Sequence, residues 1–333
     1  MRAVRRLTGR VGRSRAGLFV AEGPQAVREA VVAHVATRGG PDVVVAVYAT
    51  DQAAARYADE LDMARAAGVD IVPVDDSVLA AMTDTVTPQG LLAVCRLVDR
   101  QLEAVLDEVR ADGGTESSRR PLLIAVLAHV RDPGNAGTVL RAADAAGADA
   151  VVLTKGSVDV HNPKCVRATA GSLFHLPVVQ DADLDHVVQV LRGSGVAVLA
   201  ADGGGDHDLD DLQDDADRVA DAVLRRPTAW LFGNEAWGLE GHERGLADAV
   251  VRVPLHGRAE SLNLATAATV CLYASARAHR ARPADSRPVA GQHAGAGSGY
   301  SPVMGTRVGD SGYGIGSTSG TGDVGHGDGN GAR

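Results

Sequence analysis

Residues 122–147, LLIAVLAHVRDPGNAGTVLRAADAAG, pass from a continuous apolar run into a helical pattern. The apolar run is rich in branched residues, which is typical of a parallel strand covered on both faces. After it, Asn135 is a suitable N-cap for a helix, and Gly147 is suitable just past its end. Small apolar residues recur between them at helical spacing, at Val139, Ala142, Ala143 and Ala146. The stretch predicts a β-strand followed by an amphipathic helix, the repeating unit of a parallel α/β sheet.

The same alternation extends over residues 121–280. The apolar runs predict strands at Leu122–Val130, Ala150–Thr154, Val196–Ala200, Ala229–Phe232 and Val250–Val253. The helix predicted over Leu264–Arg280 is apolar nearly all round, so we expect it to be buried in the core or against a partner subunit. These elements predict an α/β domain built on a parallel sheet.

A smaller α/β domain is predicted over residues 16–98. Its strands are expected at Leu18–Ala21, Val43–Val47, Val69–Val72 and Gly90–Cys95, and its helices at Pro24–Ala36 and Asp51–Ala67.

Three further segments flank the two domains. Residues 1–15 hold six arginines and no acidic residue, which predicts a basic N-terminal arm. Residues 99–120 are charged and interrupted by Gly and Ser, which predicts a linker with a short helix near residues 101–109. Residues 281–333 contain 15 glycines and no apolar periodicity, which predicts a disordered tail.

The composition excludes several classes of protein. The chain has 333 residues, a formal net charge of −9 and 45% apolar residues, which argues against a uniformly basic nucleic-acid surface but allows a local patch. Three cysteines without CxxC spacing and histidines without HxxxH spacing argue against a disulfide scaffold or a metal site. The apolar stretch Leu262–Ala276 is shorter than the roughly 20 residues of a membrane span. We therefore expect a cytoplasmic protein that binds neither a membrane nor a metal.

Basic side chains follow the first two strands of the larger domain. Arg141 points away from the apolar stripe of its helix, so it is either a solvated residue paired with Asp144 or a cation at the carboxyl edge of the sheet, where ligands bind in such folds. Lys155, Lys164 and Arg167 concentrate positive charge near another strand end. This cluster is either a site for RNA phosphates or an ordinary charged loop.

Two later segments combine polar residues with glycines. Glu235 lies between Gly233 and Gly238, where the backbone can approach a ligand closely; the alternative is that Glu235 caps a following helix. Ser261 and Asn263 precede the apolar helix, and both are N-cap types although one cap suffices.

One Gly-rich segment is an unpromising nucleotide site. Gly203–Gly205 resembles a dinucleotide loop, but it lies in a stretch with eight aspartates from Asp202 to Asp217, and they would repel a pyrophosphate. An oxidoreductase dependent on a nucleotide is therefore disfavoured.

Three segments in order, DPGNAGTVLRAADAAGAD, LFGNEAWGL and VPLHGRAESLNLATAA, resemble the signature motifs of the SpoU (TrmH-like) family of SPOUT RNA 2'-O-ribose methyltransferases. The segment NPKCVRATAGSLFHLPV is similar to the stretch between the first two motifs. The N-terminal segments LFVAEGPQAVREAV and TVTPQGLLAV resemble the ribosomal-protein-like α/β substrate-binding domain often fused ahead of that family. The resemblance implies a SPOUT-type parallel sheet with a deep C-terminal trefoil knot, an exception to the rule against knotted chains.

The resemblance also implies a cofactor and site residues. Family members bind S-adenosylmethionine through backbone groups of the knot loops and are homodimers with the site at the interface. The corresponding cofactor contacts are Gly233, Val253 and Leu262, with Val253 where the family commonly has isoleucine. The implied polar set consists of Asn135, Arg141, Glu235, Ser261 and Asn263. Arg141 would assist the ribose hydroxyl, Asn135 would orient the substrate, and Glu235 would hold either the motif loops or Arg141. Ser261 and Asn263 would complete the floor of the pocket.

The expected function is methylation of a ribose 2'-hydroxyl, with rRNA as the substrate and tRNA as the alternative. A non-catalytic RNA-binding protein that retains the fold is a different possibility. The intact polar set argues against it.

Overall fold

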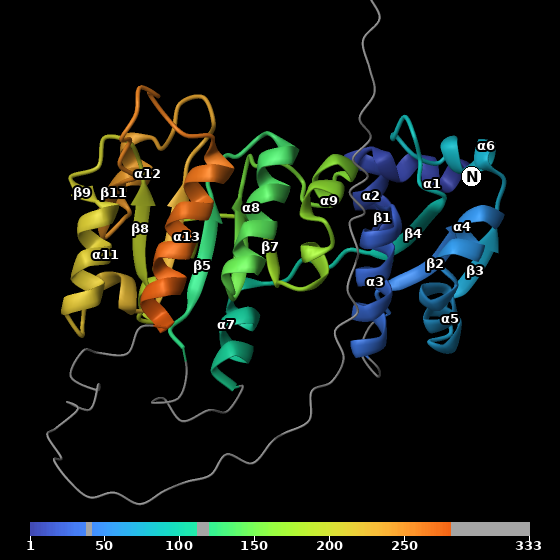
Figure 1. Ribbon diagram of the computed structural model, residues 1–333, viewed down its shortest axis with the longest axis horizontal. Helices are drawn as coiled ribbons and strands as arrows, with labels where there is room; N and C mark the ends of the chain where they lie inside the picture. Colours follow the sequence, from blue (N-terminus) through green and yellow to red (C-terminus); the bar gives the residue numbers. More distant parts are fainter. Residues whose placement is uncertain (38–41, 112–119, 281–333) are drawn as a thin grey trace, which may run out of the picture. The chain divides into compact units, whose positions relative to one another are not determined.

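The computed structural model describes residues 1–37, 42–111 and 120–280 (Figure 1). The predicted tail, 281–333, and part of the predicted linker, 112–119, lie outside the described residues. Within the described part, no helix has the length and apolar character needed to cross a membrane.

The N-terminal domain is built on a mixed four-stranded sheet with the order β1-β4-β2-β3. β4 pairs antiparallel with both β1 and β2, and β3 joins β2 in parallel. The strands are β1 (Leu18–Glu22), β2 (Val44–Ala49), β3 (Asp70–Pro73) and β4 (Leu91–Arg96), and the helices between them are α3 (Pro24–Ala36), α4 (Asp51–Arg56), α5 (Ala58–Ala66) and α6 (Asp76–Ala80). All four predicted strands are present, and the helix predicted over Asp51–Ala67 is divided at Tyr57.

The basic N-terminus folds as part of this domain. It forms α1 (Arg2–Arg5), the 3-10 turn η1 (Arg6–Thr8) and α2 (Arg10–Ala16). Val4 and Leu7 pack with Met82 in a small apolar cluster, and Arg13 is 2% exposed. Residues 1–15 are therefore packed helices rather than the separate arm that their charge suggests.

The larger domain is built on a sheet of seven parallel strands with the order β7-β6-β5-β10-β8-β11-β9. Alternate residues of each strand enter different cores, because Leu123, Ala125 and Leu127 belong to one apolar cluster and Ile124 and Val126 to another. The strands are β5 (Leu123–Leu127), β6 (Ala150–Thr154), β7 (Val178–Ala182), β8 (Ala197–Ala201), β9 (His207–Asp208), β10 (Thr228–Phe232) and β11 (Ala249–Arg252). The strands β7 and β9 are not predicted from the sequence.

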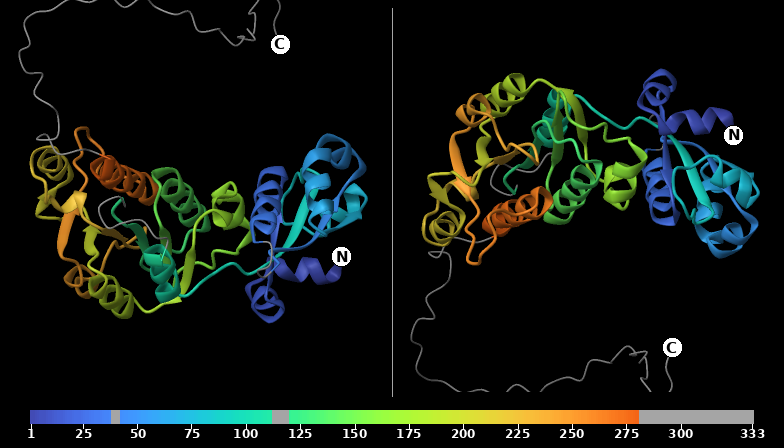
Figure 2. Two further views of the ribbon diagram at one scale, coloured as in Figure 1. Left: turned by 90° about the horizontal axis from the view of Figure 1, so that it is seen from below. Right: turned by 90° about the horizontal axis from the view of Figure 1, so that it is seen from above.

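Helices cover both faces of this sheet (Figures 1 and 2). One core receives α8 (Pro133–Ala146), α9 (Pro163–Thr169), α11 (Leu209–Arg218) and α13 (Leu264–Arg280), and the other receives α7 (Leu102–Ala111) and α10 (Leu184–Gly193). α8 and α13 lie side by side. The helix predicted inside the linker is α7, and its buried residues Leu102, Val105 and Leu106 make it part of the larger domain's core.

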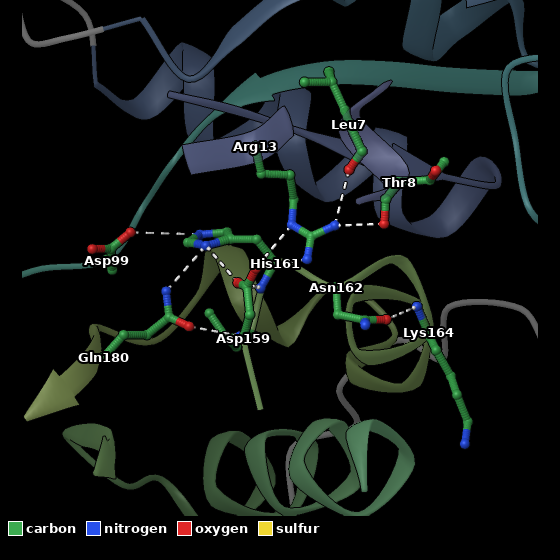
Figure 3. Close-up of polar contacts among 10 residues, drawn as sticks. Leu7, Thr8, Arg13, Asp99, Asp159, His161, Asn162, Lys164 and Gln180 are labelled. Carbon is green, nitrogen blue, oxygen red and sulfur yellow. Dashed lines mark hydrogen bonds and ion pairs between the residues drawn. The ribbon is translucent and has the colours of Figure 1, made fainter. Parts of the chain in front are cut away.

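A buried ion pair connects the N-terminal helices to the larger domain (Figure 3). The Arg13 Nε and Nη2 atoms donate to Asp159 Oδ2 at 2.9 and 2.6 Å, and Nη1 donates to the carbonyl oxygens of Leu7 and Thr8 at 2.9 and 2.7 Å. The two charged side chains are 3% and 14% exposed. The guanidinium therefore binds its own domain and the facing carboxylate at once.

His161 extends this buried cluster (Figure 3). The Val98 amide donates to His161 Nε2 at 3.3 Å, and His161 Nδ1 lies 3.2 Å from Gln180 Nε2 and 3.6 Å from Asp159 Oδ1. Burial disfavours the ionised Asp159 carboxyl, but hydrogen bonds from His161 and Arg13 outweigh it and hold the pKa of Asp159 well below its usual range.

Candidate active site

The register of the parallel strands brings the ends of four strands to one edge of the sheet. Phe232 at the end of β10 is level with Leu127 of β5 and with Ala201 of β8, and Val251 of β11 is level with Ala201. The loops that leave these strands must therefore meet at the carboxyl edge of the sheet, where ligands bind in open α/β folds.

A cavity of about 340 Å³ lies at this edge. Gly233, Val253 and Leu262, the three residues implied as cofactor contacts, all line it, and so does Ser261. Its wall also includes Asp202 and Gly203, from the Gly/Asp-rich segment that the sequence analysis disfavoured as a nucleotide site. The remaining lining comes from Ala201, Phe232, Asn234, Glu235, Ala236, Gly238, Leu255, Glu260, Leu264 and Ala267.

Position 233 requires a glycine because the backbone of the turn that follows β10 packs closely against it. A Cβ atom at this position would lie 2.3 Å from the carbonyl carbon of Gly238. The turn is closed by two hydrogen bonds of 2.9 Å between the backbones of Asn234 and Gly238. The Asn234 side chain donates to the carbonyl of His129 at 2.7 Å, which fixes the turn to the loop after β5.

Glu235 receives several hydrogen bonds from the loop that begins α8. Its carboxylate accepts from the backbone amides of Arg131 and Asp132 at 3.3 and 3.0 Å, and from Asn135 Nδ2 at 3.2 Å. Burial disfavours ionisation, but these hydrogen bonds and one from its own amide outweigh it, so the pKa of Glu235 lies below its ordinary value. Glu235 thus holds the first two motif loops together rather than capping a following helix.

Asn135 lies at the centre of the polar set. While its Nδ2 donates to Glu235, its Oδ1 accepts a hydrogen bond of 3.0 Å from Asn263 Nδ2. These contacts connect residues 100 and 128 positions apart in the chain. This chain of hydrogen bonds, from Glu235 through Asn135 to Asn263, joins all three signature segments and fixes the orientation of both asparagine side-chain amides.

The sequence predicts Asn135 as the N-cap of α8 and leaves Ser261 and Asn263 as alternatives for the N-cap of α13. The N-cap of α8 is Asp132, whose side chain accepts from the Asn135 amide, and Pro133 occupies the first helical position. Asn135 is therefore in the first turn, and its prediction as the N-cap is wrong. At α13 the cap is Asn263, whose Oδ1 accepts from the Ala265 amide at 2.9 Å. Ser261 is not used as a cap, and it stays on the cavity wall.

Arg141 lies on the exposed face of α8 and does not line the cavity. It follows Asn135 by six residues, which is about 9 Å along the helix axis. Within the described residues its side chain has no hydrogen-bond or ion-pair partner. The alternative pairing with Asp144 is not observed, because that carboxylate contacts His175 Nδ1 at 2.7 Å.

The three cations considered for RNA phosphates each contact a carboxylate. Lys155 pairs with Asp183 at 3.1 Å, Lys164 with Asp132 at 3.1 Å and Arg167 with Glu22 at 3.0 Å. The two lysines remain 62% and 59% exposed, and Arg167 is 35% exposed. Their charge is thus partly neutralised within the chain, and their contact with RNA stays a prediction.

The aspartates after Gly205 have their own structural roles. They form β9 and α11, and Leu209 and Ala216 anchor that helix in the core. Ion pairs with basic residues partly neutralise the segment, between Asp208 and Arg252, Asp214 and Arg218, and Asp217 and Arg277. Of the eight aspartates, only Asp202 lines the cavity.

Comparisons with known proteins agree with this arrangement. The model of the SpoU rRNA methylase family matches residues 122–273, and that of the MRM3-like substrate binding domain matches residues 1–93. The 23S rRNA (guanosine(2553)-2'-O)-methyltransferase RlmP of Bacillus subtilis is 33% identical over 261 residues, which are 78% of this chain and 89% of that protein.

Solved structures extend the similarity to both domains. The SpoU methyltransferase AviRb from Streptomyces viridochromogenes, in complex with AdoMet, is similar with a TM-score of 0.65 and 29% identity, over 83% of this chain and 96% of that one. An AdoMet-bound rRNA methyltransferase from Sinorhizobium meliloti has a TM-score of 0.65 and 27% identity, over 83% and 93% of the two chains. Because the family model matches residues 122–273 and a relative covered over 89% of its length is 33% identical, this chain belongs to the SpoU rRNA methylase family.

Proposed function

We propose that the protein transfers a methyl group from S-adenosylmethionine to a ribose 2'-hydroxyl of rRNA. The observation that carries the proposal is the chain of hydrogen bonds from Glu235 through Asn135 to Asn263, beside the cavity at the strand ends. Family membership supports it, and so do relatives named as 23S rRNA 2'-O-methyltransferases. These names favour rRNA over tRNA as the substrate. A cytoplasmic location is part of the proposal.

The cavity fits S-adenosylmethionine in its chemistry. Carboxylates of Asp202 and Glu260 face a ligand that carries a sulfonium and an ammonium group, and Val253 and Leu262 provide an apolar wall. Gly233 and Gly238 line the cavity without side chains, so a ligand can approach the backbone of this turn closely. When bound, the cofactor supplies an electrophilic methyl group.

Asn135 is proposed to orient the ribose. An asparagine amide has two N–H donors and two acceptor lone pairs, and the contacts to Glu235 and Asn263 use one of each. One donor and one acceptor remain for the substrate, in a geometry that the two neighbours fix. The Ser261 hydroxyl, on the cavity wall, completes the polar surface that the ribose meets. Alignment of this kind is a large part of what a methyl transfer requires.

Arg141 is proposed to act on the substrate through its charge. A guanidinium is very hard to deprotonate, so we assign it to holding a neighbouring phosphate and stabilising the developing alkoxide, not to removing the proton itself. Its exposed, unpaired position on α8 suits a ligand that arrives from outside the chain.

A homodimer is proposed to complete the site. Val270 and Tyr273 on α13, next to α8, are 38% and 49% exposed. Leu255 and Leu262, in the loop of the third signature segment, are 40% and 36% exposed. Pairing these surfaces across a two-fold axis would bury apolar area and enclose the edge that carries Asn135. Light scattering at micromolar concentration should report a dimer, and a fully active monomer would contradict this part of the proposal.

Arg141→Ala tests the assignment of the reaction, with Arg218→Ala as a matched control on α11. We expect Arg141→Ala to lower methyl transfer to unmodified 23S rRNA about 10²- to 10³-fold, the range for removing one preorganised electrostatic donor, and to leave the calorimetric Kd of S-adenosylmethionine unchanged. The control variant should keep wild-type turnover. Full activity of Arg141→Ala would refute its role, and absence of cofactor binding by the wild type would refute the function.

A further inference from the structure

An exposed tryptophan lies beside the cavity and has no role in the mechanism above. The chain has two tryptophans. Trp230 is fully buried in β10 and donates to Ser275 Oγ at 2.9 Å, whereas Trp237 is 47% exposed. The neighbours of Trp237 in the chain, Ala236 and Gly238, line the cavity, but Trp237 does not. The indole therefore lies outside the cavity, next to residues that line it.

Arg131 covers one side of this indole. Its Cζ atom lies 4.9 Å from the ring centroid, a cation–π contact. The backbones on both sides of the contact are tied together, because Glu235 accepts hydrogen bonds from the amides of Arg131 and Asp132. Trp237 is only two residues beyond Glu235. The carboxylate that holds Asn135 thus also positions the stacked pair.

The polar part of the pair is the Arg131 guanidinium. Among the described residues, the Arg131 guanidinium has no hydrogen bond and no carboxylate partner. Lys155, Lys164 and Arg167, in contrast, are each paired with a carboxylate. Arg131 can therefore offer planar N–H donors to a phosphate while its face stays on the indole.

We propose that Trp237 and Arg131 form a stacking platform for the RNA, on which a base next to the target ribose lies against the indole while Arg131 contacts a flanking phosphate. The proposal rests on the proposed function and names how that site holds its substrate. Single-stranded RNA is recognised by this combination of an exposed aromatic face and a guanidinium plane. Placement beside Asn135 and outside the cofactor pocket makes Trp237 a substrate-positioning residue.

Tryptophan fluorescence tests the platform directly. Because the other tryptophan is buried, the difference between wild-type and Trp237→Phe emission isolates the signal of Trp237. Adding unmodified 23S rRNA transcribed in vitro should quench this difference signal, as a base stacks on the indole. If RNA leaves this difference signal unchanged, the proposal is wrong. The proposal is also wrong if the signal changes only with protein concentration, because a second copy of the chain then covers Trp237.

Steady-state kinetics distinguish substrate positioning from a structural role. We expect Trp237→Ala to raise the KM for 23S rRNA on the order of 10-fold, to change kcat little and to leave the Kd of S-adenosylmethionine unchanged. Trp237→Phe should recover most of the loss, because a phenyl ring also stacks. Val219→Ala, at a residue 49% exposed beyond α11, is the control and should behave as wild type.

The outcomes separate this proposal from the proposed function. If the wild type methylates rRNA and Trp237→Ala has an unchanged KM, the platform is wrong and the function stands. If Trp237→Ala loses cofactor affinity and kcat together, Trp237 is structural and the platform is also wrong. If the wild type methylates no RNA but RNA quenches Trp237, the platform stands and the function fails.

Discussion

Replacing Arg13 with methionine should destabilise the protein strongly, although the residue lies in a segment whose sequence suggests a solvated arm. The change keeps most of the aliphatic volume and removes four hydrogen bonds, two to Asp159 and two to the carbonyls of Leu7 and Thr8. It leaves a carboxylate that is only 14% exposed without its cation. Removing one partner of such a buried pair costs about 3–5 kcal/mol in the free energy of unfolding.

Urea unfolding followed by circular dichroism measures this loss. Arg218→Met is the matched control, because its ion pair with Asp214 is 71% and 64% exposed and should contribute about 0–1 kcal/mol. Replacing Asp159 by leucine in the Arg13→Met variant should restore part of the stability, since the unpaired buried charge is then gone. A loss below about 1 kcal/mol in Arg13→Met, similar to the control, would refute the reasoning.

Two further predictions concern the same cluster and the cavity. Because the pKa of Asp159 is held below its unfolded value of about 3.9, the ionised carboxylate contributes stability that is present above that pH and is lost as the pH falls further. The stability advantage of wild type over Asp159→Asn in urea unfolding should therefore shrink from pH 6 to pH 3; a constant difference would contradict it. Gly233→Ala should abolish calorimetric binding of S-adenosylmethionine, because a methyl group at 233 would lie 2.3 Å from the carbonyl carbon of Gly238. The control Gly245→Ala, whose methyl group meets no atom within 4 Å, should bind the cofactor normally. Normal binding by Gly233→Ala would show that the turn can open.

Local patterns predicted the elements with strong periodicity. The helices α3 and α13 and the strand β6 begin and end where the sequence places them, because caps and continuous apolar runs mark their ends. The N-cap of α8 was misplaced although Asp132-Pro133 is a helix-start signal, since Asn135 is an equally good cap type. The strand β9 has only two residues and no pattern of its own; its pairing with β11 depends on the rest of the sheet.

The sequence predicted residues of the candidate site but not the hydrogen bonds between them. The motif resemblance identified Glu235, Asn135 and Asn263, yet their hydrogen bonds span 100 and 128 residues and follow from the register of the parallel strands. Asp202 was missed as a cavity residue because the acidic run that follows it outweighed its place at the end of β8. Burial of Arg13 had no local signal at all, because its partner Asp159 lies 146 residues away.

The most direct test of the central claim is the chemical identity of the product. Unmodified 23S rRNA would be incubated with the enzyme and S-adenosylmethionine carrying an isotopically labelled methyl group, digested to nucleosides and analysed by mass spectrometry. We predict that the label appears in one 2'-O-methylated nucleoside and is bound to the ribose, and that Asn135→Ala removes it. Label on a base, or no label in rRNA under conditions where the cofactor binds, would contradict the account.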